Sequence, residues 1–132
     1  MSIRDEIKRC VEADPVQLAL LRPALPGTPM KRFIFVAAEI LLLLDGPWES
    51  LELEIRWKHV RADLERFVQG GIIVVGDDGY MKRLDRAEDE IWEIRCIDPN
   101  PSVRIFGSFA EKDVFMALGY RYRQELEEKG FH

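Results

Sequence analysis

The stretch that decides the fold is IWEIRCIDPNPSVRIFGSFAEKDVFMALGY at residues 91–120. It holds three runs rich in apolar, β-branched and aromatic residues, at 91–97, 102–109 and 113–120. Such runs, bounded by turn residues, are typical of strands. DPNP and AEKD join them, and both are good turn sequences. Because connections this short link antiparallel neighbours, we predict a three-stranded antiparallel meander.

A β-hairpin is predicted just before the meander. IIVV at 72–75 reads as one strand, GDDG at 76–79 as the turn, and YMKRL at 80–84 as the return strand.

The first half of the chain is predicted to be helical. Residues 2–12 carry apolar side chains at steps of four, which favours an amphipathic helix, and VQLALL at 16–21 is expected to add a further turn. A helix is expected over 28–45, because Thr28–Pro29 is a good helix start and Gly46–Pro47 a good stop. A strand over KRFIFVA at 31–37 is the competing prediction, since periodicity does not separate a fully apolar helix from a buried strand.

Two more helices complete the prediction, one at 48–69 and a short acidic one in RQELEEKG at 123–130. Helices followed by an antiparallel sheet indicate an α+β fold: N-terminal helices packed on a small sheet, made of the hairpin and the meander, with a short C-terminal helix. We expect residues 1–27 to form a helical extension and residues 28–132 to form the main domain.

Composition narrows the class of protein. The 132 residues are 47% hydrophobic and 33% charged, which is typical of one globular domain. Cys10 and Cys96 are far apart, so neither a disulfide framework nor a zinc site is indicated. The start lacks a signal peptide, and the apolar run at 33–44 is too short to span a bilayer. We therefore expect a cytoplasmic protein with no membrane contact.

The net charge is −5, which argues against nucleic-acid binding by charge alone. The charge is unevenly distributed, however. Residues 82–123 hold 8 basic and 8 acidic side chains, so the C-terminal part of the chain is relatively basic.

Alternation along the meander predicts a cluster of arginines. With a period of two, Arg95, Arg104 and Arg121 share one face of the sheet. Three guanidinium groups on an open face would make an anion site, because each offers a planar fork to phosphate. Tyr120 or Tyr122 could stack on a base beside it. The alternative is a solvated face on which Glu93 or Glu125 pairs with the arginines.

Residues 50–126 resemble the RelE/ParE/HigB superfamily of bacterial toxins from toxin–antitoxin pairs. The resemblance rests on the order and spacing of four segments rather than on any one of them. These are MKRL with Lys82, IWEIR with Arg95, VRIFGSF with Arg104, and MALGYRYR with Arg121 and Arg123.

The resemblance implies a RelE-like fold and ribosome-dependent cleavage of mRNA, with a ribose 2′-hydroxyl attacking the adjacent phosphate and no metal or cofactor. Arg95 and Arg121 would hold the scissile phosphate, Lys82 would assist deprotonation, and Arg104 and Arg123 would contact phosphate. The implied partners are a cognate antitoxin, the ribosome and mRNA, in the bacterial cytoplasm.

Three alternatives remain open on the sequence. The first is a ParE-like toxin that targets gyrase. The second is a winged-helix DNA-binding regulator, made of helices over 28–69 and the hairpin at 72–84. The third is a non-catalytic protein-interaction domain of the same fold.

Overall fold

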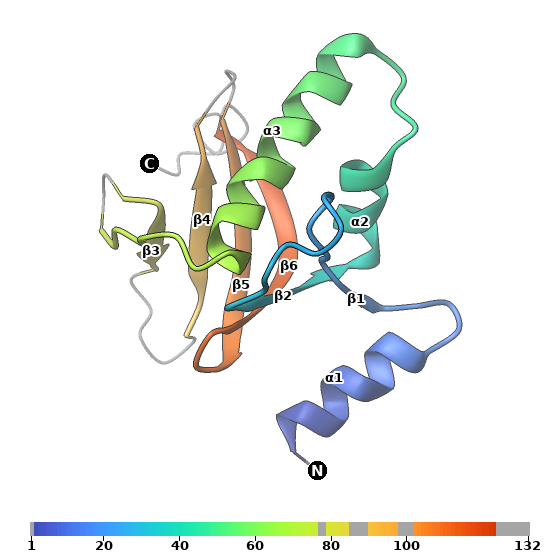
Figure 1. The fold of residues 1–132 in the computed structure, drawn as a ribbon, viewed down its shortest axis with the longest axis vertical. Coiled ribbons are helices and arrows are strands. Elements are labelled where there is room, and N and C mark those ends of the chain that lie inside the picture. Colours follow the sequence, from blue (N-terminus) through green and yellow to red (C-terminus); the bar gives the residue numbers. More distant parts are fainter. Residues whose placement is uncertain (1, 77–78, 85–89, 98–101, 124–132) are drawn as a thin grey trace.

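The computed structural model describes residues 2–76, 79–84, 90–97 and 102–123. In these residues the chain is α+β, with helices packed on a mixed sheet of six strands (Figure 1). The helices are α1 (Ile3–Glu12), α2 (Ala38–Asp45) and α3 (Leu51–Val68). The strands are β1 (Leu18–Leu20), β2 (Phe33–Ala37), β3 (Met81–Arg83), β4 (Trp92–Cys96), β5 (Val103–Glu111) and β6 (Val114–Tyr122).

The strands lie in the order β1-β2-β6-β5-β4-β3. Neighbours pair antiparallel except β2 and β6, which pair in parallel. The chain leaves β2, forms α2 and α3, and returns to the far edge of the sheet at β3, which allows β6 to finish beside β2 (Figure 1).

Local sequence explains where the helices begin and end. Ser2 caps α1 in a capping box, accepting from the backbone N–H of Asp5, whose carboxylate accepts from the backbone of Ser2. Ser50 caps α3 by accepting from the N–H of Leu53. Gly46 ends α2 with φ of 75°, a left-handed conformation that favours glycine.

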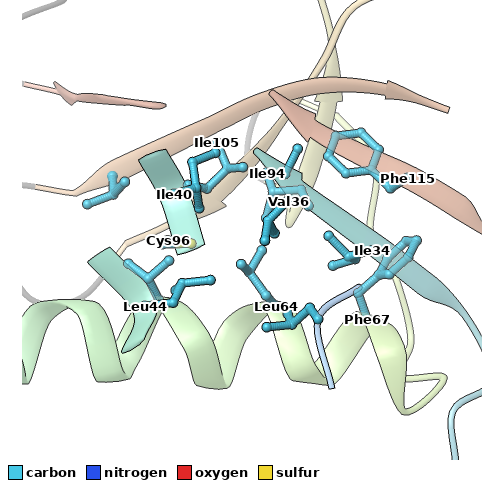
Figure 2. Packing of buried hydrophobic residues seen from close by; sticks show 14 of the residues in the cluster. Ile34, Val36, Ile40, Leu44, Leu64, Phe67, Ile94, Cys96, Ile105 and Phe115 are labelled. Atoms are coloured by element: carbon cyan, nitrogen blue, oxygen red, sulfur yellow. The ribbon is translucent and has the colours of Figure 1, made fainter. Parts of the chain in front are cut away.

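The hydrophobic core lies between one face of the sheet and helices α2 and α3 (Figure 2). Ile34, Ile94, Ile105 and Phe115 project from four strands and are fully buried. Leu64 of α3 is equally buried against them. This face is called the helix face below, and the opposite face is called the outer face.

The meander, the helix at 2–12 and the helix at 48–69 are confirmed, because β4, β5 and β6 pair antiparallel and α1 and α3 occupy the expected positions. The α+β class is confirmed at this level. The sheet is larger than predicted, and it is mixed rather than antiparallel, because β2 joins β6 in parallel.

Three local predictions were wrong. The helix expected over 28–45 covers only its second half, since residues 33–37 form β2, as the competing prediction had it. Residues 18–20 form a strand instead of a helical turn. Residues 72–75 form no strand and touch β3 through a single parallel bridge between Val75 and Met81.

The physical reason is pairing. An apolar run becomes a strand where a neighbour satisfies its backbone groups, and 72–75 meet the outer edge of β3 only at the single Val75–Met81 bridge. The tip of the expected hairpin (77–78) and the expected C-terminal helix beyond Arg123 lie outside the described residues.

Residues 1–27, expected as an extension, supply α1 and one edge of the sheet. Leu18, Ala19 and Leu20 of β1 pair with Ala37, Val36 and Phe35 of β2. Arg4 of α1 also reaches Glu111 at the end of β5, at 2.8 Å. Among the described helices, none has the length and apolar character needed to cross a membrane.

Candidate functional site

Three arginines form one continuous row across the meander, and Arg121 joins it through the register shift between β5 and β6 at Phe106 and Gly107. Arg95 of β4 is the register partner of Arg104 of β5, which in turn pairs with Arg121 of β6. Register partners point to the same side of a sheet, and adjacent strands are about 5 Å apart. The row lies on the outer face, because the intervening residues Ile94, Ile105 and Tyr120 project toward the helices.

One carboxylate stands beside the arginine row. Glu93 accepts a hydrogen bond from Nε of Arg95 at 3.1 Å, and both side chains are largely buried, with 9% and 14% exposed. The sequence predicted this pairing of Glu93 with an arginine as the alternative to an anion site. It engages the guanidinium of Arg95, while the guanidinium of Arg121 donates to the backbone carbonyl of Tyr120 at 2.5 Å.

Arg104, at the centre of the row, is 6% exposed. Among the described residues it has no carboxylate within 4.0 Å. Burial lowers the pKa of Arg104, Glu93 opposes this effect, and the charges of Arg95 and Arg123 add to it. A buried guanidinium flanked by two cations favours a bound anion, which would offset both the desolvation and the repulsion.

Two further predicted residues lie on or near this face. Lys82 of β3 is the register partner of Glu93, which places the lysine on the outer face, one row away from Arg95. Arg123 follows β6 directly, and its backbone N–H donates to the carbonyl of Ser102 at 2.8 Å. Its effect on the pKa of Arg104 shows that the two guanidinium groups lie within electrostatic reach.

The two tyrosines are not brought together with the arginine row. Tyr120 and Tyr122 point to the helix face and meet the ring of Trp57 edge-on, with centroids 5.2 Å and 6.5 Å away. The guanidinium of Arg56 lies 5.3 Å from the ring of Tyr122. The alternation of tyrosine and arginine in GYRYR at 119–123 therefore separates a core aromatic cluster from a surface cation.

Two of the elements expected for a winged-helix domain, the full helix over 28–45 and the hairpin at 72–84, are not formed in the described residues, although α3 is. Residues 33–37 belong to the sheet, and 72–75 do not pair with β3 as a hairpin strand. Without these elements the DNA-binding alternative loses the observation on which it depended.

Sequence reasoning gave no role to Phe106, an aromatic side chain of the outer face. Phe106 of β5 is the register partner of Glu93 on one side and of Gly119 on the other. It is therefore beside the arginine row, where the tyrosines had been expected. The signal was present in the alternation of VRIFGSF, which puts Phe106 on the same face as Arg104.

The residues described by the structure contain no group of three or more His, Cys, Asp or Glu side chains arranged to hold a metal ion. Comparison with known proteins gives no relative: no protein-family model, no curated protein and no solved structure matches the chain.

Proposed function

We propose that the protein is a toxin-like RNA endoribonuclease, which cleaves ribosome-bound mRNA and is neutralised by a cognate antitoxin. The observation that carries the proposal is the arginine row Arg95–Arg104–Arg121 on the outer face. The resemblance of residues 50–126 to the RelE/ParE/HigB superfamily supplies the reaction class.

The proposed chemistry needs charge stabilisation more than any other contribution. When the ribose 2′-hydroxyl attacks the adjacent phosphate, negative charge gathers on the phosphate oxygens, and the 5′-oxygen of the next nucleotide leaves. Guanidinium groups fixed by strand pairing stabilise that charge without reorganising. Arg104 and Arg121 would stabilise most of this negative charge, because Arg95 is already hydrogen-bonded to Glu93.

Lys82 is the residue that we assign to deprotonation of the 2′-hydroxyl. It lies on the outer face, next to Glu93 and one row from the arginines. Arg123 would contact a neighbouring phosphate. Because the row sits on paired strands rather than on loops, its spacing is set by the sheet itself.

Expression in bacterial cells tests this proposal. Wild type, Arg95→Ala and Arg121→Ala would be induced in parallel, with Arg22→Ala as the control, because Arg22 is exposed on the connection that follows β1. We expect growth arrest and new 5′ ends inside codons for wild type and Arg22→Ala, and loss of both for the other two variants.

The other outcomes are equally informative. Arrest without mRNA cleavage would point to gyrase and contradict the nuclease proposal. Normal growth with folded, soluble wild-type protein and intact mRNA would overturn the toxin activity altogether. Circular dichroism of each variant separates a lost site from a lost fold.

A second candidate function is protein binding without catalysis, and one surface favours it. Ile72, Val74 and Ile97 are 91%, 59% and 58% exposed. They line a cavity of about 420 Å³ together with His59 and Tyr80. Exposed apolar side chains gathered in this way are typical of an interaction surface. Under this alternative, a charge introduced by Val74→Glu would abolish binding, while Arg121→Ala, outside the cavity lining, would retain it.

A further inference from the structure

The outer face carries an aromatic side chain in a position that the proposed function does not use. Phe106 is partly exposed and belongs to the row Lys82–Glu93–Phe106–Gly119, which runs directly beside the arginine row. Along β5 it is two residues from Arg104, a separation of about 7 Å. Phe106 is thus within the span of one nucleotide from the centre of the row.

Phe106 has no structural role in the described part of the chain that would explain an aromatic ring. It is absent from the residues that pack on the hydrophobic core. The ring contacts among described residues join Trp57, Phe67, Trp92, Phe109, Phe115, Tyr120 and Tyr122, and none of them involves Phe106.

The space beside this ring is open on the β6 side. Gly119 is the register partner of Phe106, and a Cβ built on Gly119 meets no atom within 4 Å. The backbone of Gly119 does not have the positive φ that would require glycine. The backbone conformation therefore does not require glycine at this position, and the absence of a side chain leaves a flat area beside Phe106.

We propose that Phe106 and Gly119 form a stacking platform for an unpaired base of single-stranded RNA, with the neighbouring phosphate held by Arg104 and Arg121. The inference rests on the proposed function, because it names how that same site holds its substrate. An aromatic ring accepts the face of any base, so the platform gives affinity with little sequence preference. Charge complementarity selects the occupant: an apolar ring bordered by guanidinium groups suits a chain of alternating bases and phosphates better than an apolar peptide.

The experiment measures binding of a short 2′-O-methyl oligonucleotide, which cannot be cleaved by attack of a 2′-hydroxyl. It also measures binding of a series of the same oligonucleotide in which each member lacks the base at one position. Phe106→Leu is expected to weaken binding on the order of tenfold, the usual scale of one stacked base, and Phe106→Trp to restore it. Gly119→Leu should weaken binding similarly by covering the platform. Phe33→Leu is the matched control, because Phe33 is 38% exposed at the start of β2, away from the arginine row.

The abasic series identifies the platform independently of the fold of any variant. For wild type, affinity should fall when the base at one particular position of the oligonucleotide is removed. For Phe106→Leu, removal of the base at that position should cause no further fall in affinity. Binding that depends on Arg121 but is indifferent to Phe106, Gly119→Leu and base removal would overturn the platform and leave the proposed function standing. Absence of RNA binding by folded wild type would overturn both.

Discussion

At the scale of single residues, the sequence predicted the strand on which a side chain lies better than it predicted the residues that the side chain contacts. The period of two correctly put Arg95 and Arg104 on one face, but along β6 it would place Arg121 with the core residues Phe115 and Ala117. Arg121 joins the row because the register shifts between Phe106 and Gly107, from Gly119 to Ala117. The period also separated Tyr120 from Arg121, although it did not show that the tyrosine would pack on Trp57. Which face of a strand is buried depends on a helix about 60 residues earlier in the chain, and a local pattern holds no such information.

Two buried ionisable groups predict how stability depends on pH. Burial raises the pKa of the Cys96 thiol and of the Tyr80 hydroxyl above their ordinary values. The unfolded chain therefore loses these protons at a lower pH than the folded protein. Once pH exceeds the ordinary thiol pKa of about 8.5, the folded state binds more protons than the unfolded state, so stability falls as pH rises.

Chemical denaturation at pH 8 and pH 10 measures this effect. For wild type we expect the free energy of unfolding to fall by about 1.4 kcal/mol per group and per pH unit above the unfolded pKa. Cys96→Ala should flatten the decline. An equal decline in wild type and Cys96→Ala would contradict the role assigned to the buried thiol.

At the scale of elements, the strongest patterns predicted the right structures and the most apolar runs did not. The meander and α3 were recognisable because turns and periodicity agreed. Residues 33–37 and 72–75 are both apolar, and only the first is a strand. The difference is the partner: β2 finds β6, about 80 residues away in the chain, whereas 72–75 meet the edge strand β3 at a single bridge. Long-range pairing of this kind leaves no local signal.

The β5–β6 pair makes a prediction of its own. Its register shifts between Phe106 and Gly107, and a Cβ on Gly107 would lie 1.8 Å from the carbonyl oxygen of Met116. Gly107→Ala must push the two strands apart, which we expect to destabilise the protein by about 3 kcal/mol. Gly119→Ala on the partner strand should change stability by less than about 1 kcal/mol, since its Cβ meets nothing. Urea unfolding of both variants tests the pair, and equal midpoints would show that the strands do not approach so closely.

At the scale of the whole molecule, charge distribution matters more than net charge. The chain carries a net charge of −5, yet the outer face of the meander gathers Arg95, Arg104 and Arg121 around a single described carboxylate, Glu93. Composition alone argues against binding a polyanion, because it averages over both faces of the sheet. The fold separates the apolar helix face from the cationic outer face, and this separation depends on strand pairing across the whole chain.

The central claim is that the arginine row binds RNA phosphates, and the salt dependence of binding tests it most directly. Affinity for a single-stranded 2′-O-methyl oligonucleotide would be measured across salt concentrations for wild type, Arg121→Ala and the control Arg22→Ala. Each phosphate contact to a single strand contributes about 0.7 to the slope of log affinity against log salt. We predict that the slope for Arg121→Ala is smaller by about that amount and that Arg22→Ala matches wild type. Identical slopes for all three folded proteins would contradict the claim that the row binds phosphate.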